Sequence, residues 1–314
     1  MIHLLDRRLL FVSGKGGTGK STVSAAIADL AVARGRRVLV CEMDAKGALA
    51  AAFGSPPLAF APTEVEPGLF AMAMDTEESL REYLRLFVKI PLVGRLGPLS
   101  RTFDFVAAAA PGVKEILGVG KLCHEVREEH YDLVVVDAEA SGHVVAQIDA
   151  PRAIRELVHV GLVREQTDWM LEILADPART GLVVVTTPEE TPVTETLELV
   201  DRVRRTTTVD LAAVIVNRVL PRWFSDADEG VLSAMAQTEA RSLLTEVAGP
   251  GLDTVFDTAT FARVRRSAMS ESLAMLRSGL PPELQVVLLP ELFTRAGGRR
   301  VVSLLAEALE LELD

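Results

Sequence analysis

The feature that most constrains the fold is a glycine-rich segment between an apolar run and an amphipathic helix. The run Leu9–Val12 predicts a buried strand, and the next segment, Gly14–Ser21, reads Gly-Lys-Gly-Gly-Thr-Gly-Lys-Ser. Apolar residues then recur with helical spacing over residues 23–30, and Gly35 suits the end of that helix. This strand–loop–helix order satisfies the pattern G-x-x-x-x-G-K-[ST] of a phosphate-binding loop.

The residue types of this loop suit phosphate chemistry. Glycines let backbone N–H groups turn towards a phosphate without a Cβ in the way, and the helix N-terminus adds its positive dipole end. Lys20 would reach the β- and γ-phosphates, and the Ser21 hydroxyl would bind Mg²⁺. The predicted nucleotide-contacting residues are Gly14, Lys15, Gly16, Gly17, Thr18, Gly19, Lys20, Ser21 and Thr22.

Other short apolar runs predict the remaining strands of an α/β fold. They are Val38–Cys41, Leu69–Met74, Leu133–Val136, Leu182–Thr186, Ala213–Val216 and Val286–Leu289. Several are continuously apolar, which is typical of strands buried on both faces of a parallel sheet. We therefore expect a P-loop NTPase fold with a mostly parallel central sheet flanked by helices.

Three stretches lack strand patterns and show helical spacing instead. With 314 residues the chain has room for two domains or one large one. We predict a single nucleotide-binding domain over 1–314, with a helical subdomain formed by about 76–130 and 150–179. A further helical block, 226–277, precedes the last predicted strand.

Composition excludes several classes of protein. The formal charge of −11 argues against a chain that grips nucleic acid, which needs a basic face. No apolar stretch approaches the roughly 20 residues of a membrane span, and the N-terminus lacks a signal-peptide pattern. We expect a soluble, cytoplasmic protein with at most peripheral membrane association, and no nucleic acid among its partners.

Lysine is scarce, which gives weight to the second lysine of the loop. The chain has six lysines, and Lys15 and Lys20 both lie in the phosphate loop. A lysine directly after the first glycine resembles the deviant Walker A motif of the SIMIBI ATPases, such as MinD, ParA, the nitrogenase iron protein and ArsA. That resemblance implies a dimer with ATP between the subunits, in which Lys15 reaches the partner's nucleotide. The alternative is an ordinary surface lysine.

The segment after the fourth predicted strand narrows the resemblance. Asp137 ends an apolar run, and residues 137–143 are similar to the D-T-A-P-T-G-H segment of the ArsA and tail-anchored-protein targeting ATPase family. Asp137 is then expected to hold Mg²⁺ or its water, the alternative being a helix cap. Gly142 and His143 also match, although a histidine here could equally be a packed loop residue.

The resemblance extends along the chain and indicates which residues would contact the adenine base of the nucleotide. The apolar run 213–216 ends in Asn217 and Arg218, and the matching Asn of the family recognises the adenine edge. A turn-forming Asn is the alternative. Pro290, after the last predicted strand, is assigned to the nucleotide site with them. Residues 110–115 and 186–196 also resemble family segments, and the nearest branch is that of actinobacterial ArsA-like proteins that occur in pairs.

One departure bears on catalysis. The family segment D-P-A-H-x-x-x-D corresponds to Asp44–Ala51, and the resemblance assigns the attacking water to its last Asp, where this chain has Ala51. Loss of a general base removes about 10²–10⁴-fold of rate, so we expect an ATPase with slow turnover. Asp44 and Glu139 are the candidate replacement carboxylates, although Glu139 can also be read as a solvated loop residue. Glu42 lies with Asp44 at the end of the second predicted strand.

The residues that bind zinc or arsenite in other members of the resembled family are missing from this sequence. The chain has no CxxC pair, so no zinc is expected, and the cysteines of the arsenite site are missing. Cys41 and Cys123 are interpreted as core residues. An apolar client groove in the helical subdomain is one reading of a set of large side chains, and ordinary core is the other. The set comprises Leu84, Phe87, Ile90, Leu92, Val93, Leu96, Leu99, Phe103 and Phe105.

Two functions therefore stay open. The first is an ATP- and Mg²⁺-dependent dimerising switch, as a homodimer or as a heterodimer with an ArsA-like paralogue, with a hydrophobic protein client as a further expectation. The second is a hydrolysis-impaired regulatory subunit that pairs with an active paralogue. ParA-like DNA partitioning is disfavoured by the acidic charge and the helical insertion.

Overall fold

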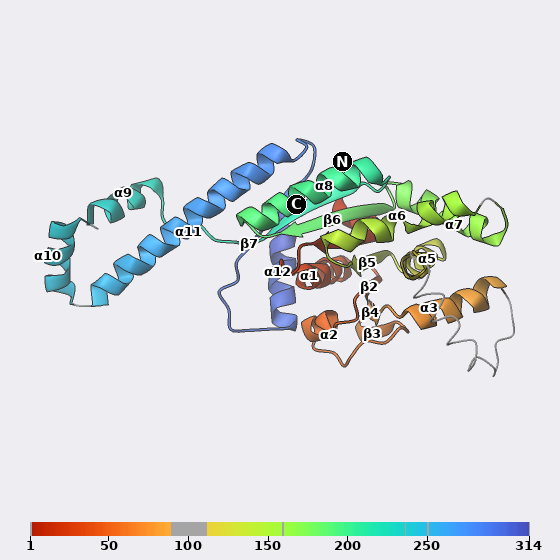
Figure 1. The fold of residues 1–314 in the computed structure, drawn as a ribbon. Helices are drawn as coiled ribbons and strands as arrows, with labels where there is room; N and C mark the ends of the chain where they lie inside the picture. Colours follow the sequence, from red (N-terminus) through yellow and green to blue (C-terminus); the bar gives the residue numbers. More distant parts are fainter. Residues whose placement is uncertain (1, 89–111, 159, 236, 250, 314) are drawn as a thin grey trace.

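A mostly parallel sheet forms the centre of the molecule. The computed structural model describes residues 2–88, 112–158, 160–235, 237–249 and 251–313, and in this part of the chain eight strands run in the order β3-β4-β2-β5-β1-β6-β7-β8 (Figure 1). The strands are β1 Leu9–Gly14, β2 Val38–Glu42, β3 Thr63–Glu66, β4 Leu69–Ala73, β5 Leu133–Asp137, β6 Thr180–Thr186, β7 Leu211–Val219 and β8 Val286–Pro290.

Helices connect these strands. The described helical segments are η1 Leu4–Asp6, α1 Lys20–Ala33, α2 Ala48–Phe53, α3 Thr76–Tyr83, the π-helical turn η2 Leu84–Val88, α5 Val113–Arg127, α6 Ser141–Leu157, α7 Leu162–Ala175, α8 Glu190–Thr206, α9 Asp226–Met235, α10 Thr238–Ala248, α11 Gly251–Gly279 and α12 Arg299–Leu313. The expected α/β class is confirmed.

The sequence predicts seven of the strands, and it misses β3. Every neighbouring pair is parallel except β3 with β4, which is antiparallel. The missed strand is Thr-Glu-Val-Glu, with Thr63 and Glu64 exposed. A short polar edge strand carries neither the continuous apolar run nor the clear alternation that identifies a buried strand.

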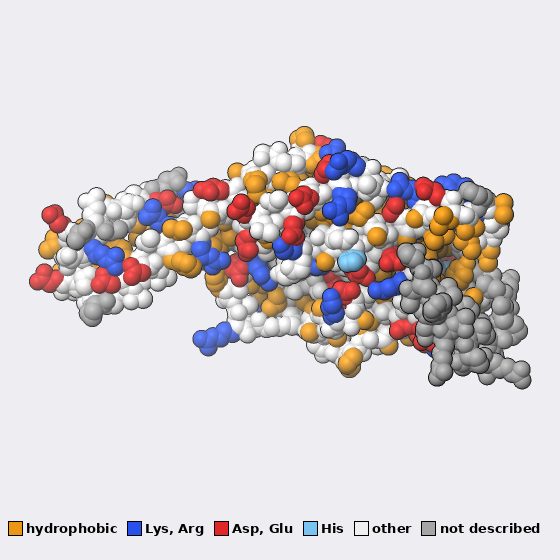
Figure 2. All heavy atoms as spheres, in the orientation of Figure 1, with side chains coloured by type: hydrophobic (Ala, Val, Ile, Leu, Met, Phe, Trp, Pro, Cys, Tyr) orange, Lys and Arg blue, Asp and Glu red, His pale blue; other side chains and the backbone are white. Residues whose placement is uncertain are grey.

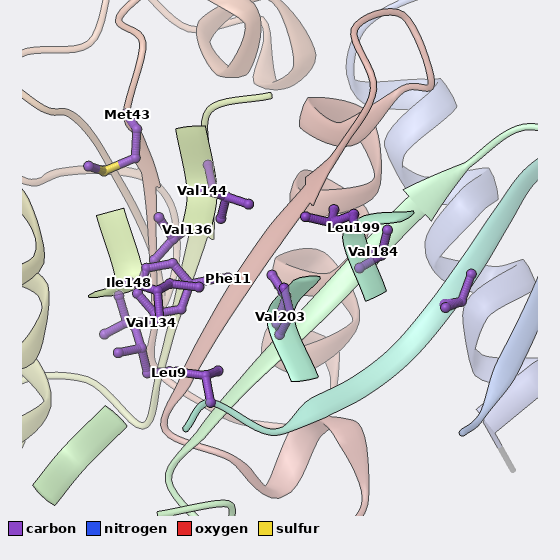
Figure 3. Packing of buried hydrophobic residues seen from close by; sticks show 14 of the residues in the cluster. Leu9, Phe11, Met43, Val134, Val136, Val144, Ile148, Val184, Leu199 and Val203 are labelled. Carbon is purple, nitrogen blue, oxygen red and sulfur yellow. The ribbon is translucent and has the colours of Figure 1, made fainter. Parts of the chain in front are cut away.

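Successive residues of the central strands point alternately into two hydrophobic cores, one on each face of the sheet. Leu9 and Phe11 belong to one buried cluster, and their neighbours Leu10 and Val12 belong to the other. On the first face the strands pack against α5–α8 and α11; Figure 3 shows α6 beside β1 and β5, and α8 beside β6. On the second face α1, α2 and α12 cover the sheet and contact one another. This alternation follows from the period of two along a strand and gives three layers.

The helices of the predicted subdomain lie beside the sheet on the first face. Helices α3, α6 and α7 each pack against α5. α6 runs unbroken from Ser141 to Leu157 although Pro151 lies inside it, so the predicted boundary at 150 falls within a helix. The division into 76–130 and 150–179 stays a prediction.

The block 226–277 forms a helical arm. Its helices α9, α10 and α11 span Asp226–Gly279, and α11 packs its second half against α8. Figure 1 shows α9, α10 and the start of α11 extending away from the sheet. The arm lies between β7 and β8 in the sequence, but its described residues add no strand to the sheet. The two strands are therefore adjacent and parallel.

Candidate nucleotide-binding site

The carboxyl ends of three neighbouring strands bring the predicted phosphate and metal residues together. β5 lies between β2 and β1, and Asp137 at its end is register partner to Val12 on one side and Glu42 on the other. The phosphate loop leaves β1 at the same edge and enters α1 at Lys20. Ligands of open parallel sheets bind at such strand ends.

Two glycines are required by the shape of the loop. A Cβ on Gly14, whose φ is +148°, would lie 2.0 Å from the Val185 carbonyl oxygen on β6. Gly19 has φ +91°, and a Cβ there would lie 2.5 Å from the amide nitrogen of Asn217. Only glycine fits either place, because both the backbone conformation and the close approach exclude a side chain.

The backbone carbonyl of Lys15 accepts hydrogen bonds from two side chains of the loop. The buried Thr18 hydroxyl donates to it at 2.9 Å, and the Lys20 ammonium donates to it at 3.2 Å. Burial lowers the pKa of Lys20, and the carboxylates of Asp137 and Asp44 oppose that shift. The hydrogen bond to the Lys15 carbonyl thus keeps the Lys20 side chain folded into the loop, where it can meet a phosphate.

Asp137 is a buried carboxyl with an unused oxygen. Burial raises its pKa from 3.8 to about 6, while a hydrogen bond from Ser21 and the charge of Lys20 act in the opposite direction. Its Oδ1 is buried without a hydrogen-bond partner in the described structure. A hydroxyl and an unpartnered carboxylate oxygen are hard oxygen donors, so Ser21 and Asp137 fit Mg²⁺.

Lys15 has a partner that the sequence did not reveal. Its ammonium forms an ion pair with Glu195 on α8, 180 positions away in the chain. Glu195 falls in the segment 186–196, whose resemblance to a family segment does not indicate this contact. The reach of Lys15 across a dimer interface stays a prediction, and in the single chain Glu195 neutralises this cation.

Asn217 supports the loop from β7. Its side-chain amide donates to the Thr18 carbonyl at 2.9 Å, and its amide oxygen accepts from the Arg218 N–H at 3.0 Å. Arg218 is exposed and has a left-handed φ of +61°. Pro290 ends β8, which is separated from β1 by β6 and β7. Adenine recognition by these residues stays a prediction, and Asn217 already has a structural role.

The segment between β2 and α2 places its two candidate positions differently. The charge of Asp44 acts on both Lys20 and Asp137, and its carboxylate accepts from Lys46 at 2.6 Å. Ala51 lies exposed on α2, where its carbonyl oxygen is 3.1 Å from the position of a Cβ on Gly298. Within this segment, Asp44 is therefore the carboxylate whose charge reaches Lys20 and Asp137.

Glu139 is engaged away from the loop lysine. Its carboxylate lies 3.4 Å from Lys114 on α5 and 3.8 Å from the exposed His143 on α6. Its backbone carbonyl accepts from the Ser13 hydroxyl at 2.8 Å, which ties the segment after β5 to the end of β1. A catalytic role for Glu139 stays a prediction that these contacts do not favour.

The remaining residue predictions concern the core and the helical subdomain. Cys41 and Cys123 are both free thiols buried in the first core cluster, and burial raises the pKa of each. No group of three or more His, Cys, Asp or Glu side chains that could hold a metal ion occurs among the described residues. The apolar client set lies mostly within 89–111, outside the described residues.

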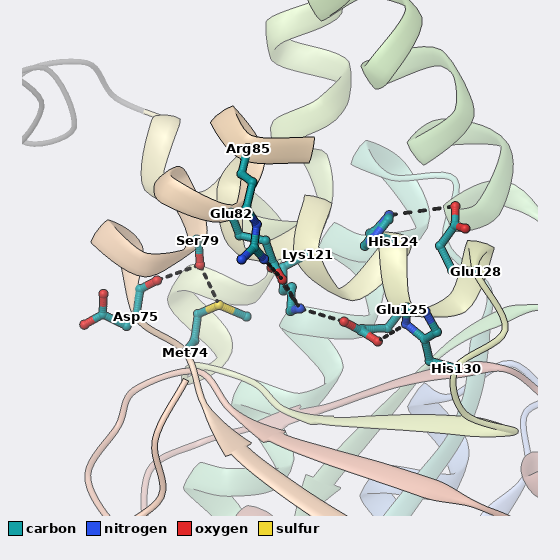
Figure 4. Close-up of polar contacts among 10 residues, drawn as sticks. All are labelled: Met74, Asp75, Ser79, Glu82, Arg85, Lys121, His124, Glu125, Glu128 and His130. Carbon is teal, nitrogen blue, oxygen red and sulfur yellow. Dashed lines mark hydrogen bonds and ion pairs between the residues drawn. The ribbon is translucent and has the colours of Figure 1, made fainter. Parts of the chain in front are cut away.

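An apolar cavity of about 250 Å³ lies between the helices of the subdomain. Its apolar lining comes from α3, η2, α5, α6 and α7 and includes Leu80, Leu86, Ile116, Leu117, Val163 and Met170. Lys121 at its edge is held by Glu82 and Glu125 at 2.8 and 2.6 Å, as Figure 4 shows. The volume is below the roughly 300–1,000 Å³ typical of small-molecule pockets.

Figure 2 shows acidic and basic side chains interspersed over the visible face, without one extended basic region. Across the part of the chain that the structure describes, no helix combines the length and apolar character needed to cross a membrane.

Comparison with known proteins agrees with this architecture. The sequence profile of the anion-transporting ATPase family matches residues 7–167 and 155–249. The ATPase BagA of Mycobacterium tuberculosis is 33% identical over 232 residues, which cover 70% of this chain and 68% of that protein. An uncharacterized protein of Streptomyces coelicolor is 35% identical over 157 residues, or 47% of this chain and 38% of that protein. The ATPase ASNA1 homolog of Entamoeba dispar is 23% identical over 266 residues, or 70% and 79%.

The profile match over residues 7–167 spans the phosphate loop, the strand that ends in Asp137 and the helices between them. The mycobacterial relative also agrees with the expected actinobacterial branch. The chain belongs to the anion-transporting (ArsA) ATPase family.

Proposed function

We propose that this protein binds Mg²⁺ and ATP in the loop 14–22 and hydrolyses the terminal phosphate as a dimerising switch. The observation that carries the proposal is the meeting of Lys20, Ser21 and Asp137, from α1 and β5, around an unpartnered buried carboxylate oxygen. A glycine turn alone would explain neither the burial of Asp137 nor the ammonium aimed into the loop.

Each residue has a definable task. The N–H groups of the loop and the start of α1 bind the phosphates, and Lys20 stabilises charge that develops on them. Ser21 and Asp137 hold Mg²⁺, which supplies charge neutralisation at the phosphate oxygens. Asn217 keeps the loop in shape by holding the Thr18 carbonyl.

Asp44 is the carboxylate best placed to orient the attacking water. It is exposed, and its charge acts on Lys20 and Asp137. Ala51 has no group that could orient or deprotonate water, so within the segment 44–51 this role falls to Asp44. Asp44→Asn is expected to lower the turnover number about 10²–10⁴-fold, with nucleotide affinity retained.

The test is ATP binding and turnover by the purified protein, with a phosphate-release assay as readout. Lys20→Ala is expected to abolish both, whereas Arg205→Ala removes an exposed cation of α8 and should leave both unchanged. Absence of ATP binding by the unaltered protein, alone and mixed with a homologous partner, would refute the proposal.

A regulatory subunit is the second candidate, and Ala51 favours it. Under this alternative the protein binds ATP but turns it over only with an active paralogue that supplies the base. The discriminating measurement is turnover by the protein alone compared with an equimolar mixture. Robust turnover by the lone protein would exclude the regulatory alternative.

Handling of a hydrophobic client is a further part of the proposal. The support is the apolar lining of the cavity between α3, η2, α5, α6 and α7, which at about 250 Å³ is too small for a helix as it stands. Binding of a fluorescent apolar helical peptide, measured by anisotropy with and without ATP, tests it. If the peptide binds neither in the presence nor in the absence of ATP, client handling is removed from the proposal.

A further inference from the structure

Glu42 is an acidic residue at the centre of the site to which the phosphate-loop pattern gives no role. It ends β2 and is only 2% exposed. Its register partner is Asp137 on β5, so the two side chains leave the sheet from adjacent strand ends. Register partners in a parallel pair project to the same face, and each carboxylate therefore lies in the field of the other. The charge of Glu42 accordingly opposes ionisation of Asp137.

The two oxygens of Glu42 have different environments. Oε1 accepts a hydrogen bond from the Ala48 N–H at 2.8 Å, the first N–H of α2. Oε2 is buried and has no hydrogen-bond partner in the described structure, as is also true of Asp137 Oδ1. A buried carboxylate oxygen without a donor carries a desolvation penalty, so a pair of them indicates a missing donor or cation between the strand ends.

The loop between Glu42 and α2 is held at both ends. The Met43 N–H donates to the Asp137 carbonyl at 3.1 Å, and Ala48 is held by Glu42. Between them Ala45 has φ +47°, a left-handed conformation that is sterically unfavourable for alanine. Release of one end of a strained loop favours its rearrangement.

We propose that Glu42 couples the metal at Asp137 to the position of α2. Its free oxygen accepts a hydrogen bond from water on the metal, and its other oxygen holds the first turn of α2. The proposal rests on the proposed Mg²⁺ and ATP binding, and it gives Glu42 a positioning role. Because α2 packs against α1 and α12, a change at its first turn reaches the second face of the sheet.

The test uses Mn²⁺ as the metal probe, with a non-hydrolysable ATP analogue and the full chain. Mn²⁺ affinity is measured by electron paramagnetic resonance, and hydrogen exchange follows the amides of 48–53 with and without Mn²⁺. Glu42→Gln keeps an oxygen for Ala48 but removes the charge, so Mn²⁺ affinity should fall about 10–100-fold. The metal-dependent protection of 48–53 should disappear. Glu283→Gln, the same change in an exposed residue before β8, is the control and should alter neither readout.

A second variant guards against misfolding of the first. Glu42→Asp keeps the charge but is shorter by one methylene, so it cannot serve Ala48 and the metal water together. It should retain more Mn²⁺ affinity than Glu42→Gln and lose the protection of α2. Unchanged affinity and protection in either folded variant would overturn the proposal for Glu42. If the unaltered protein binds no Mn²⁺ with the nucleotide analogue, the proposed function fails as well, so the two failures are distinguishable.

Discussion

Asp137 shows how one residue links the fold to its chemistry. Burial raises its pKa to about 6, so the folded protein binds this proton more tightly than the unfolded chain does. For an acid whose pKa is raised by folding, stability falls as pH rises between the two values, here between about 4 and 6. In the absence of a metal, the ionised form destabilises the folded state at neutral pH.

We expect Asp137→Asn to stabilise the nucleotide- and metal-free protein at pH 7 by on the order of 2 kcal/mol, with little effect at pH 4. The measurement is urea unfolding at several pH values between 4 and 7. The same variant should lose Mg²⁺ binding, since it loses the negative charge of the metal ligand. Parallel stability profiles for the two proteins would contradict the assignment.

Gly19 provides a second test at the scale of one residue. Gly19→Ala places a methyl group 2.5 Å from the Asn217 amide, whereas Gly35→Ala has a similar φ, +81°, but meets no described atom within 4 Å. Both variants carry the left-handed strain of about 1–2 kcal/mol, and Gly19→Ala carries the clash in addition. We expect a greater loss of unfolding free energy in Gly19→Ala than in Gly35→Ala. Equal losses of unfolding free energy in the two variants would show that the Asn217 side chain moves away from the added methyl group without destabilising the protein.

At the scale of the elements, an ionic network joins α3 to α5. Lys121 is 7% exposed and lies between Glu82 of α3 and Glu125 of its own helix, while His130 contacts Glu125 at 2.7 Å (Figure 4). Burial by itself would raise the pKa of Glu125, but Lys121 and His130 bring it below its ordinary value. A buried carboxylate left without its cation is strongly destabilising.

We therefore expect Lys121→Met to lower the free energy of unfolding by about 3 kcal/mol or more. Lys114→Met, at an exposed lysine on the same helix, is the control and should lie within about 0.5 kcal/mol of the original protein. Urea unfolding followed by circular dichroism measures both. Similar stabilities for the two variants would mean that Glu82 and Glu125 find other partners.

At the scale of the whole molecule, the open question is assembly. Lys15 is neutralised within the chain by Glu195, so a role for Lys15 across an interface requires that this pair open. Half-exposed ion pairs contribute about 0–1 kcal/mol, which a bound nucleotide on a partner readily exceeds. The pair is thus a weak restraint and does not prevent association.

We expect Lys15→Ala to bind ATP with nearly unchanged affinity but to lose nucleotide-dependent dimerisation. Glu195→Gln should strengthen dimerisation, because it frees Lys15 from its partner in the same chain. Sedimentation velocity with and without a non-hydrolysable ATP analogue measures the effect. A monomer in every condition, also with a homologous partner, would remove the dimer from the proposed function.

The sequence determined the local architecture because each local element carries its own periodicity. Buried parallel strands are continuously apolar, so seven strands were predictable, while the polar edge strand β3 carried no such pattern. The phosphate loop was equally predictable, since Gly14 and Gly19 occupy backbone conformations that other residues avoid.

Only the tertiary structure decided which distant side chains meet. β5 enters the sheet between β2 and β1, and this places Asp137 beside Glu42 and the loop. The contacts of Lys15 with Glu195 and of Asn217 with Thr18 span 180 and 199 positions. Periodicity reports the face on which a residue lies, whereas strand order and helix packing set its neighbours. For that reason the contacts of Glu42 and Glu195 emerged from the fold, whereas Lys20 and Ser21 were predictable from the sequence.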